Sequence, residues 1–595
     1  MRMKPLRFPL AILVEALLVA APLRAATYTI DPSRITTEWS AAGVPGGFQQ
    51  YRPGGANARS NFAHDVIYYG ADPTGTNDCS IAFRAARNAC AGTNQVMVIP
   101  AGTYKLADQV DLYGNMTWRG AGVGQTTIML YDGGRFYSDG DSPVPTPTVT
   151  VTAGATRGST VLTVDNASTV VPGKLVSLTV LNPSYVHMQL AYYGGGPSDD
   201  GHDATRLMSI TFRVVSKDNG AKTVTLDHAL PIDMTGTPML TVWSGYCLRQ
   251  VGFEDMTVDA SNNVSSWGQM FLLDQTDSCW FYNVNFHHLY RRSVWFQKSV
   301  NCTVEHCDAD STRAPGAGAN SEGLDFYHSD CWNLVQNCAF DNAGYPMIIL
   351  GDFGGGCVGN VIAYNYARNE TGATSAPMAV SGNHGPHNMF NLWEGNYAQN
   401  YASDGYFGSD SHNTLARNYF SGQYDRAIYD DECAIVLAHW ATTYNIVGNV
   451  LGTGGGYSTI YKASGTSYQN GVIFRLGYPN EGNRSGWSTQ ESNPTDPTHF
   501  DTNVEASAII HANYDFVNNA QTFISTDHDI PSSYYLSSKP AWFGNLTWPA
   551  FDPSNPGTPT PAQIPAGYRF TNGVEPPGVG TTQPPANAKT QIQAR

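Results

Sequence analysis

The chain has 595 residues and a formal net charge of −16 at neutral pH, and only 14% of its residues are charged. Its 60 glycines and 33 tyrosines suit turn-rich all-β structure and argue against helical bundles and coiled coils. An acidic surface is a poor partner for nucleic acid or an anionic membrane, so we expect neither as a partner. The sequence does not indicate an oligomeric state.

Residues 1–26 have the features of a secretory signal peptide. Basic residues at 2, 4 and 7 precede an apolar run over 8–23, and small residues for cleavage follow Arg24. The protein is therefore expected to be secreted, either extracellular or periplasmic. The ten cysteines suit such an oxidising compartment, but no grouping among them suggests zinc.

A helix is expected near residue 80, with Asn77 or Asp78 as its N-cap and an apolar face that includes Ile81. A strand, a Pro-x-Gly turn and further strands follow it. Such a helix would cover an open sheet edge at the start of a stack of coils. Cys79 and Cys90 flank the helix about 16 Å apart, which is too far for a disulfide between them.

A short phrase recurs in the second half of the chain: an apolar residue, two variable residues, Asn, and then Cys, Tyr or Val. Its Asn residues are Asn337, Asn365, Asn396, Asn418 and Asn449. Imperfect repeats of this length, rich in β-forming residues and broken by Gly and Asp, are typical of a solenoid built from strands. We therefore predict an all-β, single-stranded parallel β-helix.

Alignment of these repeats predicts two structural columns. The apolar residues three before each Asn should point inward, and Asn360, Asn391 and Asn413 should form a hydrogen-bonded ladder. Cys307 and Cys338 are expected to stack in neighbouring coils as a disulfide or a buried thiol pair. The inward column is predicted to consist of Leu334, Ile362, Trp393, Leu415 and Ile446.

Composition and repeats divide the chain into six parts. The strand pattern over 148–152 and 223–226 alternates like a small inserted β-subdomain. The tail is rich in Pro, Gly, Thr and Gln and is expected to be disordered. The predicted parts are a signal peptide (1–26), an N-terminal cap with the first coils (27–136), the inserted subdomain (137–245), the β-helix core with the active site (246–475), a C-terminal cap (476–552) and the tail (553–595).

A column of Asp and His lies 12 to 14 residues before the repeat Asn. It comprises Asp325, Asp352, His384 and Asp404, which we predict to be catalytic. Because coils stack about 4.8 Å apart, these side chains should be neighbours. Solvated corner residues are the alternative, since Asp is common in turns. The predicted substrate-binding residues are Glu322, His328, His387, Asp410, Tyr327 and Tyr406.

The segment 64–131 resembles the N-terminal entry of pectate-lyase-like right-handed β-helix proteins, in the branch that contains rhamnogalacturonases and polygalacturonases. The runs Asn320-Ser321-Glu322-Gly323-Leu324-Asp325, Gly351-Asp352-Phe353 and Gly382-Asn383-His384-Gly385 are similar in order to polygalacturonase motifs. Glu322 stands where that family has Asp, Asp352 is single, and the basic pair that grips a uronate is not evident. The resemblance therefore implies the right-handed fold and puts galacturonan in doubt.

Three functions fit these observations. The leading one is a secreted glycoside hydrolase that acts on a polysaccharide without an organic cofactor, with Asp352 and Asp325 as acid and base or nucleophile. The second is a polysaccharide lyase, with calcium as a possible cofactor and basic residues drawn from Arg292, Lys298, Arg313 and the histidines. The third is a non-catalytic glycan-binding solenoid. Asp430-Asp431-Glu432 is a solvated loop or a calcium cluster.

Overall fold

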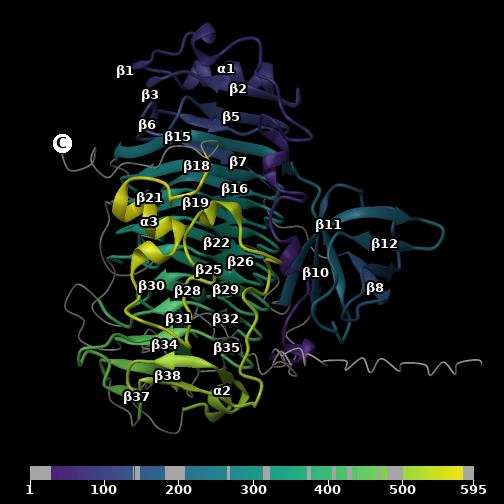
Figure 1. Ribbon diagram of the computed structural model, residues 1–595. Helices are drawn as coiled ribbons and strands as arrows, with labels where there is room; N and C mark the ends of the chain where they lie inside the picture. The colour runs from purple at the N-terminus through teal and green to yellow at the C-terminus, as the bar shows by residue number, and fades with distance from the viewer. Residues whose placement is uncertain are drawn as a thin grey trace, which may run out of the picture.

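A computed structural model shows a stack of parallel coils with a small barrel at its side (Figure 1). The structure describes residues 28–138, 140, 148–180, 208–263, 268–312, 322–370, 377–404, 410–424, 432–439, 441–464, 469–478 and 500–580. The predicted signal peptide, Arg313, Tyr406, Asp430 and Asp431 lie outside these residues. In the described part, no helix has the length and apolar character needed to cross a membrane.

The first coils lie under a single helix, as the sequence predicts. Helix α1 (Ser80–Cys90) follows β1 (Thr74–Asp78) and covers the open end of the stack (Figure 1). Asp78 Oδ1 accepts hydrogen bonds from the Ser80 N–H at 3.0 Å and the Ser80 hydroxyl at 2.6 Å, which orders the first turn. Phe83 is buried in the core, whereas Ile81 is 74% exposed, so the apolar face is rotated from the expected one.

Each coil contributes a strand to each of three parallel rows. Row 1 contains β2 (Gln95–Ile99), β5 (Met116–Gly120), β20 (Thr303–Glu305), β23 (Leu334–Gln336), β26 (Val361–Ala363), β29 (Leu392–Glu394), β32 (Thr414–Ala416), β35 (Asn445–Val447) and β39 (Ile509–His511). Row 2 contains β1, β3 (Gly102–Leu106), β6 (Thr126–Tyr131), β21 (Asp308–Asp310), β24 (Ala339–Asp341), β27 (Tyr366–Arg368), β30 (Tyr397–Ala398), β33 (Tyr419–Phe420), β36 (Val450–Leu451) and β40 (Asn513–Asp515). The long strands β15 (Val251–Asn262) and β18 (Trp280–His287) run through both rows.

Row 3 forms a separate sheet on another face of the stack. Its strands are β4 (Gln109–Asp111), β7 (Arg135–Ser138), β16 (Gln269–Asp274), β19 (Arg292–Gln297), β22 (Leu324–His328), β25 (Ile348–Gly355), β28 (Val380–Asn383), β31 (Tyr401–Ser403), β34 (Cys433–Ala438), β38 (Val472–Tyr478) and β37 (Ile460–Lys462). The short pair β14 (Leu248–Arg249) and β17 (Thr276–Asp277) completes the coils. The parallel pairing of successive coils confirms the predicted parallel β-helix.

Asparagine ladders hold the coils in register. Asn365 donates from its backbone N–H and its Nδ2 to Asn396 Oδ1, at 3.0 and 3.1 Å. The same geometry repeats through Asn418, Asn449 and Asn513, one coil beyond the last repeat found in the sequence. The predicted ladder of Asn360, Asn391 and Asn413 is also present.

The register of one coil differs from the prediction. The Cys338 N–H donates to Asn365 Oδ1 at 3.0 Å, so Cys338 and not Asn337 occupies the ladder position. The inward residue of that coil is therefore Val335, which pairs with Ile362, whereas Leu334 faces the C-terminal cap. Cys307 and Cys338 are adjacent free thiols, with the Cys307 N–H 3.4 Å from Cys338 Sγ. The thiol-pair alternative is thus the one that the structure has.

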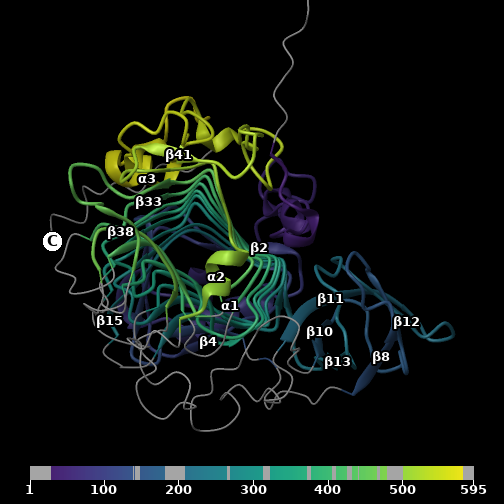
Figure 2. The same cartoon turned by 90° about the horizontal axis from the view of Figure 1, so that it is seen from below.

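The inserted residues form a closed antiparallel barrel beside the coils (Figure 2). Its strands are β8 (Val149–Ala153), β9 (Val161–Val164), β10 (Leu175–Val180), β11 (Met208–Asp218), β12 (Thr223–Leu226) and β13 (Met239–Val242). The barrel core continues into the coils, because Val300, Cys331, Val358 and Met389 pack in the same cluster as the barrel residues. A barrel joined by a shared apolar core is held firmly against the stack.

Both ends of the described chain pack on the outside of the coils. The N-terminal strap (residues 28–60) contains η1 (Pro32–Arg34), η2 (Glu38–Ala41) and η3 (Phe48–Tyr51), and η4 (Val66–Tyr69) follows it. At the far end of the stack, α2 (Thr502–Ser507) lies over the coils with Val504 in the main core, and β41 (Ala520–Thr522) pairs with β40 (Figure 2). The C-terminal segment that follows contains η8 (Ala541–Phe543), η9 (Pro561–Gln563) and α3 (Pro565–Asn572) and returns along the outside of the stack (Figure 1).

Part of the tail that was expected to be disordered is folded. Residues 553–580 include α3, whose Arg569 is 1% exposed. Arg569 Nη1 and Nη2 donate to the side-chain and backbone oxygens of Asn337, each at 2.7 Å. Composition suggested disorder because the segment has few apolar residues, but docking on the coils supplies partners that an isolated tail lacks.

Candidate active site

The structure brings the predicted catalytic column together on row 3. Asp325 lies in β22 and Asp352 in β25, whereas His384 and Asp404 directly follow β28 and β31. These four strands are consecutive neighbours in the sheet. The repeat spacing therefore identified residues that are close in space although they are up to 79 positions apart.

Local backbone features direct the carboxylates out of the core. Leu324 and Phe326 are buried in the apolar core, so the alternation of the strand turns Asp325 to the outer face. The pairing of β22 with β25 shifts after Phe326, where Gly351 has a φ of +65°. A Cβ atom on Gly351 would lie 2.3 Å from Asn388 Nδ2. This position therefore requires glycine, and the irregularity places Asp352 beside Asp325.

Two arginines on the preceding coil bind three carboxylates. Arg292 Nη2 lies 2.6 Å from Asp352 Oδ2 and 3.5 Å from Glu322 Oε2, and its Nε pairs with Asp325. Arg291 Nε donates to Glu322 Oε2 at 3.0 Å. One oxygen from each carboxylate lies within 4.8 Å of the others, and all three side chains are buried. We call these five residues the acidic cluster.

The acidic cluster separates the pKa values of its carboxyl groups. Burial would raise the pKa of Glu322, but the charges of Arg292 and Arg291 outweigh burial and lower it. Burial, together with the charge of Glu322, raises the pKa of Asp352. Burial also raises the pKa of Asp325 well above its ordinary value, despite Arg292. Compared with ordinary carboxyl groups, Glu322 thus loses its proton more readily, whereas Asp352 and Asp325 retain theirs to higher pH.

His384 and Asp404 form an ion pair beside the acidic cluster. His384 Nδ1 lies 2.6 Å from Asp404 Oδ2, and the histidine side chain is 20% exposed. Burial would lower the pKa of His384, but Asp404, Asp352 and Glu322 raise it to about 9. The imidazole is therefore protonated at neutral pH, which makes it a hydrogen-bond donor and a poor base.

Aromatic side chains lie next to the cluster. The Arg292 guanidinium stacks 4.3 Å from the centre of the Trp295 ring, and Tyr327 meets Trp295 edge to face at 5.1 Å. Both aromatic residues are partly exposed. Among the residues that the structure describes, the buried Trp295 Nε1 has no hydrogen-bond partner. Exposed aromatic faces of this kind are suited to the apolar face of a sugar ring.

The other predicted contact residues are distributed differently. Asp410 is buried and accepts hydrogen bonds from Ser403, Asn413 and Tyr444. Its carboxyl group therefore binds other buried side chains of the coils. His387 is also buried, and burial lowers its pKa to about 3. His328 is buried at the end of β22, next to the Tyr327 ring. A substrate role for these residues stays a prediction.

The acidic cluster supplies oxygen donors of the kind that calcium prefers. However, the Arg292 guanidinium already contacts all three carboxylates. It thus supplies the positive charge that a divalent ion would bring. A cation would have to compete with Arg292 for the same oxygens, so the donor set does not fit a calcium site.

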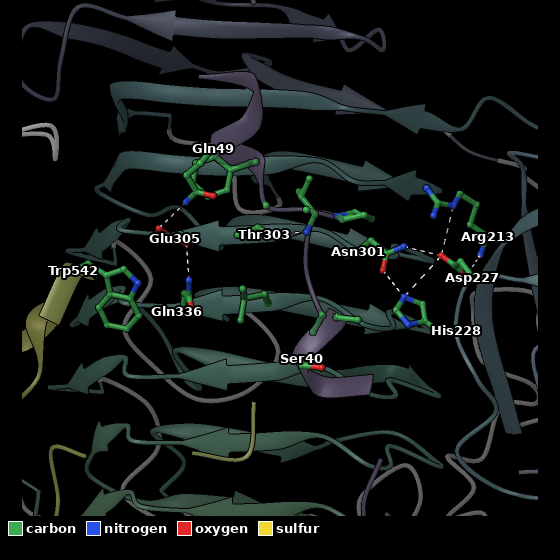
Figure 3. A pocket seen from close by; sticks show the side chains of 18 residues that line it. Ser40, Gln49, Arg213, Asp227, His228, Asn301, Thr303, Glu305, Gln336 and Trp542 are labelled. Atoms are coloured by element: carbon green, nitrogen blue, oxygen red, sulfur yellow. Dashed lines mark hydrogen bonds and ion pairs between the residues drawn. The ribbon is translucent and has the colours of Figure 1, made fainter. Parts of the chain in front are cut away.

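A cavity of about 750 Å³ lies away from the acidic cluster, on row 1, between the N-terminal strap, the barrel and the C-terminal segment (Figure 3). On one side, Asn301 Nδ2 donates to Asp227 Oδ2 at 2.8 Å, and Asn301 Oδ1 contacts His228 Nε2 at 2.7 Å. On the other side, Glu305 accepts hydrogen bonds from Gln49 and Gln336. These polar groups bind one another across the elements, so they join the strap and the barrel to the coils.

The sequence suggested the carboxylates but missed most of their surroundings. Arg292 was considered only for a lyase, and neither Arg291 nor Trp295 was predicted to lie in the site. The spacing in the sequence could have indicated Arg292, since it precedes Asp325 by 33 residues, about one coil. It was missed because that coil lacks the repeat phrase that aligned the others.

The fold and this site define a parallel β-helix protein with a buried acidic cluster on one face. No protein-family model matches the chain, and no curated protein sequence matches it. Solved structures with a similar fold include a tailspike of Acinetobacter baumannii bacteriophage AP22 in complex with a capsular saccharide, at 11% identity and a TM-score of 0.37 over 69% of this chain and 68% of that one.

Two further similar structures are parts of enzymes. The A-module of a mannuronan C-5 epimerase from Azotobacter vinelandii is 12% identical, with a TM-score of 0.33 over 69% of this chain and 91% of that one. The catalytic unit of a GH87 alpha-1,3-glucanase from Streptomyces thermodiastaticus is 14% identical, with a TM-score of 0.28 over 70% of this chain and 59% of that one.

Proposed function

We propose that the protein hydrolyses glycosidic bonds of a polysaccharide at the acidic cluster. One observation carries this proposal: Asp352 and Glu322 contact the same guanidinium, yet the pKa of the first is raised and that of the second is lowered. Glycoside hydrolysis needs one protonated and one ionised carboxyl group on the two sides of the scissile bond.

The roles follow from protonation and position. Asp352 is the general acid that protonates the leaving oxygen, and Glu322 is the ionised partner that activates water or attacks the anomeric carbon. Asp325 and Arg292 are positioning residues, because Arg292 fixes all three carboxylates. The His384 imidazolium donates a hydrogen bond to a sugar oxygen, and Trp295 stacks on a sugar ring.

The charges of the site favour hydrolysis over β-elimination. A lyase needs a base at C5 and a positive charge that neutralises the uronate. Here both arginines already bind carboxylates, and His384, with a pKa of about 9, is a poor base at neutral pH. Because neither arginine is free to pair with a uronate carboxylate, we expect a neutral glycan as substrate.

The test is incubation with a panel of neutral and uronate polysaccharides, with reducing ends and the ultraviolet absorbance of unsaturated uronate followed together. We expect reducing ends without absorbance. Asp352→Asn should lower the rate about 10²–10⁴-fold. Its melting temperature should change little, because asparagine resembles the protonated acid. Asp108→Asn is the control, since Asp108 is 62% exposed and pairs with Arg84 outside the site.

Each other outcome contradicts part of the proposal. Absorbance that rises with the reducing ends would make the protein a lyase. Full activity of Asp352→Asn would remove Asp352 from the mechanism. Binding of a glycan in the panel without either signal would favour the non-catalytic solenoid.

A further inference from the structure

A second group of titratable side chains lies away from the acidic cluster, on the outer face of row 2. Asp259 in β15 pairs in register with His287, the last residue of β18, and His288 follows directly. Asp310, the last residue of β21, lies on the next coil. The coil repeat therefore brings two carboxylates and two imidazoles together from three successive coils.

The distances between these side chains are those of a set of metal ligands. His288 Nδ1 lies 3.2 Å from Asp259 Oδ1. Two ligands that are each about 2.1 Å from one tetrahedral ion lie about 3.4 Å apart. One ligand atom from each of Asp259, His287 and His288 lies within 4.8 Å of the other two. Small side-chain rotations would therefore bring all three into contact with one ion.

Neighbouring groups fix the orientation of the cluster. His287 Nδ1 pairs with Asp310, which leaves Nε2 as the nitrogen available to a ligand. A carboxylate on the far nitrogen is the usual support of a metal-binding histidine. The Ser261 N–H donates to Asp259 Oδ1 at 2.7 Å and holds that carboxylate in place.

The cluster is also accessible to an ion from solution. The side chains of Asp259, His287 and His288 are 15%, 16% and 38% exposed. In contrast to the carboxylates of the acidic cluster, Asp259 contacts His288 and Ser261 and, within the described part of the chain, no arginine. Two groups of potential metal ligands are found within the described chain, the carboxylates of the acidic cluster and this one, and this one contains histidine.

We propose that Asp259, His287 and His288 bind a divalent transition-metal ion of the zinc class, with Asp310 as the supporting carboxylate. Two imidazole nitrogens and one carboxylate oxygen are donors that suit zinc, whereas calcium and magnesium prefer sets made of oxygen alone. Because the ligands come from two successive coils and the support comes from a third, the ion clips three coils together. The site is independent of the proposed glycan hydrolysis.

The test is equilibrium dialysis of the full chain, without a histidine tag, against zinc alone, followed by metal analysis. We expect about one equivalent of zinc, a higher melting temperature with zinc, and a cobalt complex with the visible spectrum of a low-symmetry site. The double variant His287→Gln/His288→Gln should lose all three signals. His64→Gln is the control, because His64 is exposed and stacks on Tyr68 at 3.8 Å, away from the cluster.

The single variant His288→Gln removes the most exposed ligand and should fold even if the double variant does not. It should weaken zinc binding at least tenfold. Zinc uptake that is unchanged in both variants, or absent from the unmodified chain, would overturn the proposal. Binding of calcium with no binding of zinc would overturn the assignment of the ion class.

Discussion

Asp352 and Glu322 contact one guanidinium but have opposite pKa shifts, and the difference comes from what else each of them touches. Glu322 has a second arginine, Arg291, at 3.0 Å, whereas Asp352 is buried next to the negative charge of Glu322. At the scale of single residues, the chemistry of the site thus depends on how two arginines are shared among three carboxylates.

This sharing predicts a bell-shaped dependence of kcat/KM on pH. Activity should fall as the pH drops through the lowered pKa of Glu322, and again as it rises through the raised pKa of Asp352. Arg291→Gln removes one of the two charges that lower the pKa of Glu322, so its acidic limb should move to higher pH. Arg84→Gln is the control, because Arg84 is partly exposed and pairs with Asp108 outside the site. A pH–rate profile that is identical in Arg291→Gln and in this control would contradict the assignment of Glu322.

At the scale of the elements, the asparagine ladders join successive coils through side-chain hydrogen bonds. Asn396 accepts from Asn365 and donates through Nδ2 to Ile362 O at 2.8 Å and to Asn418 Oδ1 at 2.9 Å. Each amide satisfies backbone groups at a buried corner, where water cannot reach. The Asn of the repeat phrase thus supplies hydrogen bonds between coils, and its apolar residue supplies the core.

Asn396→Ala should lower the free energy of unfolding by about 2–4 kcal/mol, because it leaves several buried polar groups without partners. Asn369→Ala is the matched control, since Asn369 lies at an exposed position of the preceding coil and bonds Asp341. Urea unfolding of both variants measures the difference. An equal loss of unfolding free energy in both variants would show that an amide in the ladder stabilises the protein no more than an exposed amide does.

A buried cation, together with apolar packing, holds α3 on the coils. Arg569 donates to both oxygens of Asn337, so Arg569→Ala should free the C-terminal segment from the coils. We expect a loss of about 2–4 kcal/mol, as for other buried hydrogen-bonded charges. Limited proteolysis should then cut within residues 553–580 before the coils are cut. Cleavage at the same rate in the unmodified chain would show that α3 is not held by this contact.

For the whole molecule, the strap, the barrel and the coils meet at His228. Its Nδ1 lies 3.1 Å from Glu38 Oε2 in the strap, and its Nε2 lies 2.7 Å from Asn301 Oδ1 in the coils. Burial would lower the pKa of His228, but Glu38, Asp227 and Asn301 outweigh burial and raise it. One barrel residue therefore connects three parts of the chain that are remote in sequence.

A raised pKa in the folded state stabilises the protein at low pH and loses this contribution as the pH rises through the folded pKa. The stabilisation by His228 should thus be complete below its ordinary pKa of 6.5. We expect His228→Gln to lower the melting temperature more at pH 5.5 than at pH 9. Thermal unfolding at the two pH values measures this, and an equal loss at both would contradict a charged His228.

The sequence alone determined the architecture, because a periodic fold needs the same side chains at each turn. The spacing of Asn365, Asn396, Asn418 and Asn449 predicted parallel coils, and the aligned Asp and His residues predicted one face of the site. The predicted register was wrong at the coil of Asn337, where Cys338 occupies the ladder position. Alignment on the repeat phrase could not detect this shift, because Asn337 itself matches the phrase.

Only the tertiary structure decided the state of each charged group. Arg291 and Arg292 lie outside the repeat phrase, yet their charges lower the pKa of Glu322, whereas burial and the charge of Glu322 raise the pKa of Asp352. The folding of the tail around Arg569 and the clustering of His287 and His288 with Asp259 were also decided there. The physical reason is that periodicity specifies which residues stack, whereas a pKa or a ligand set depends on distances between side chains that no repeat encodes.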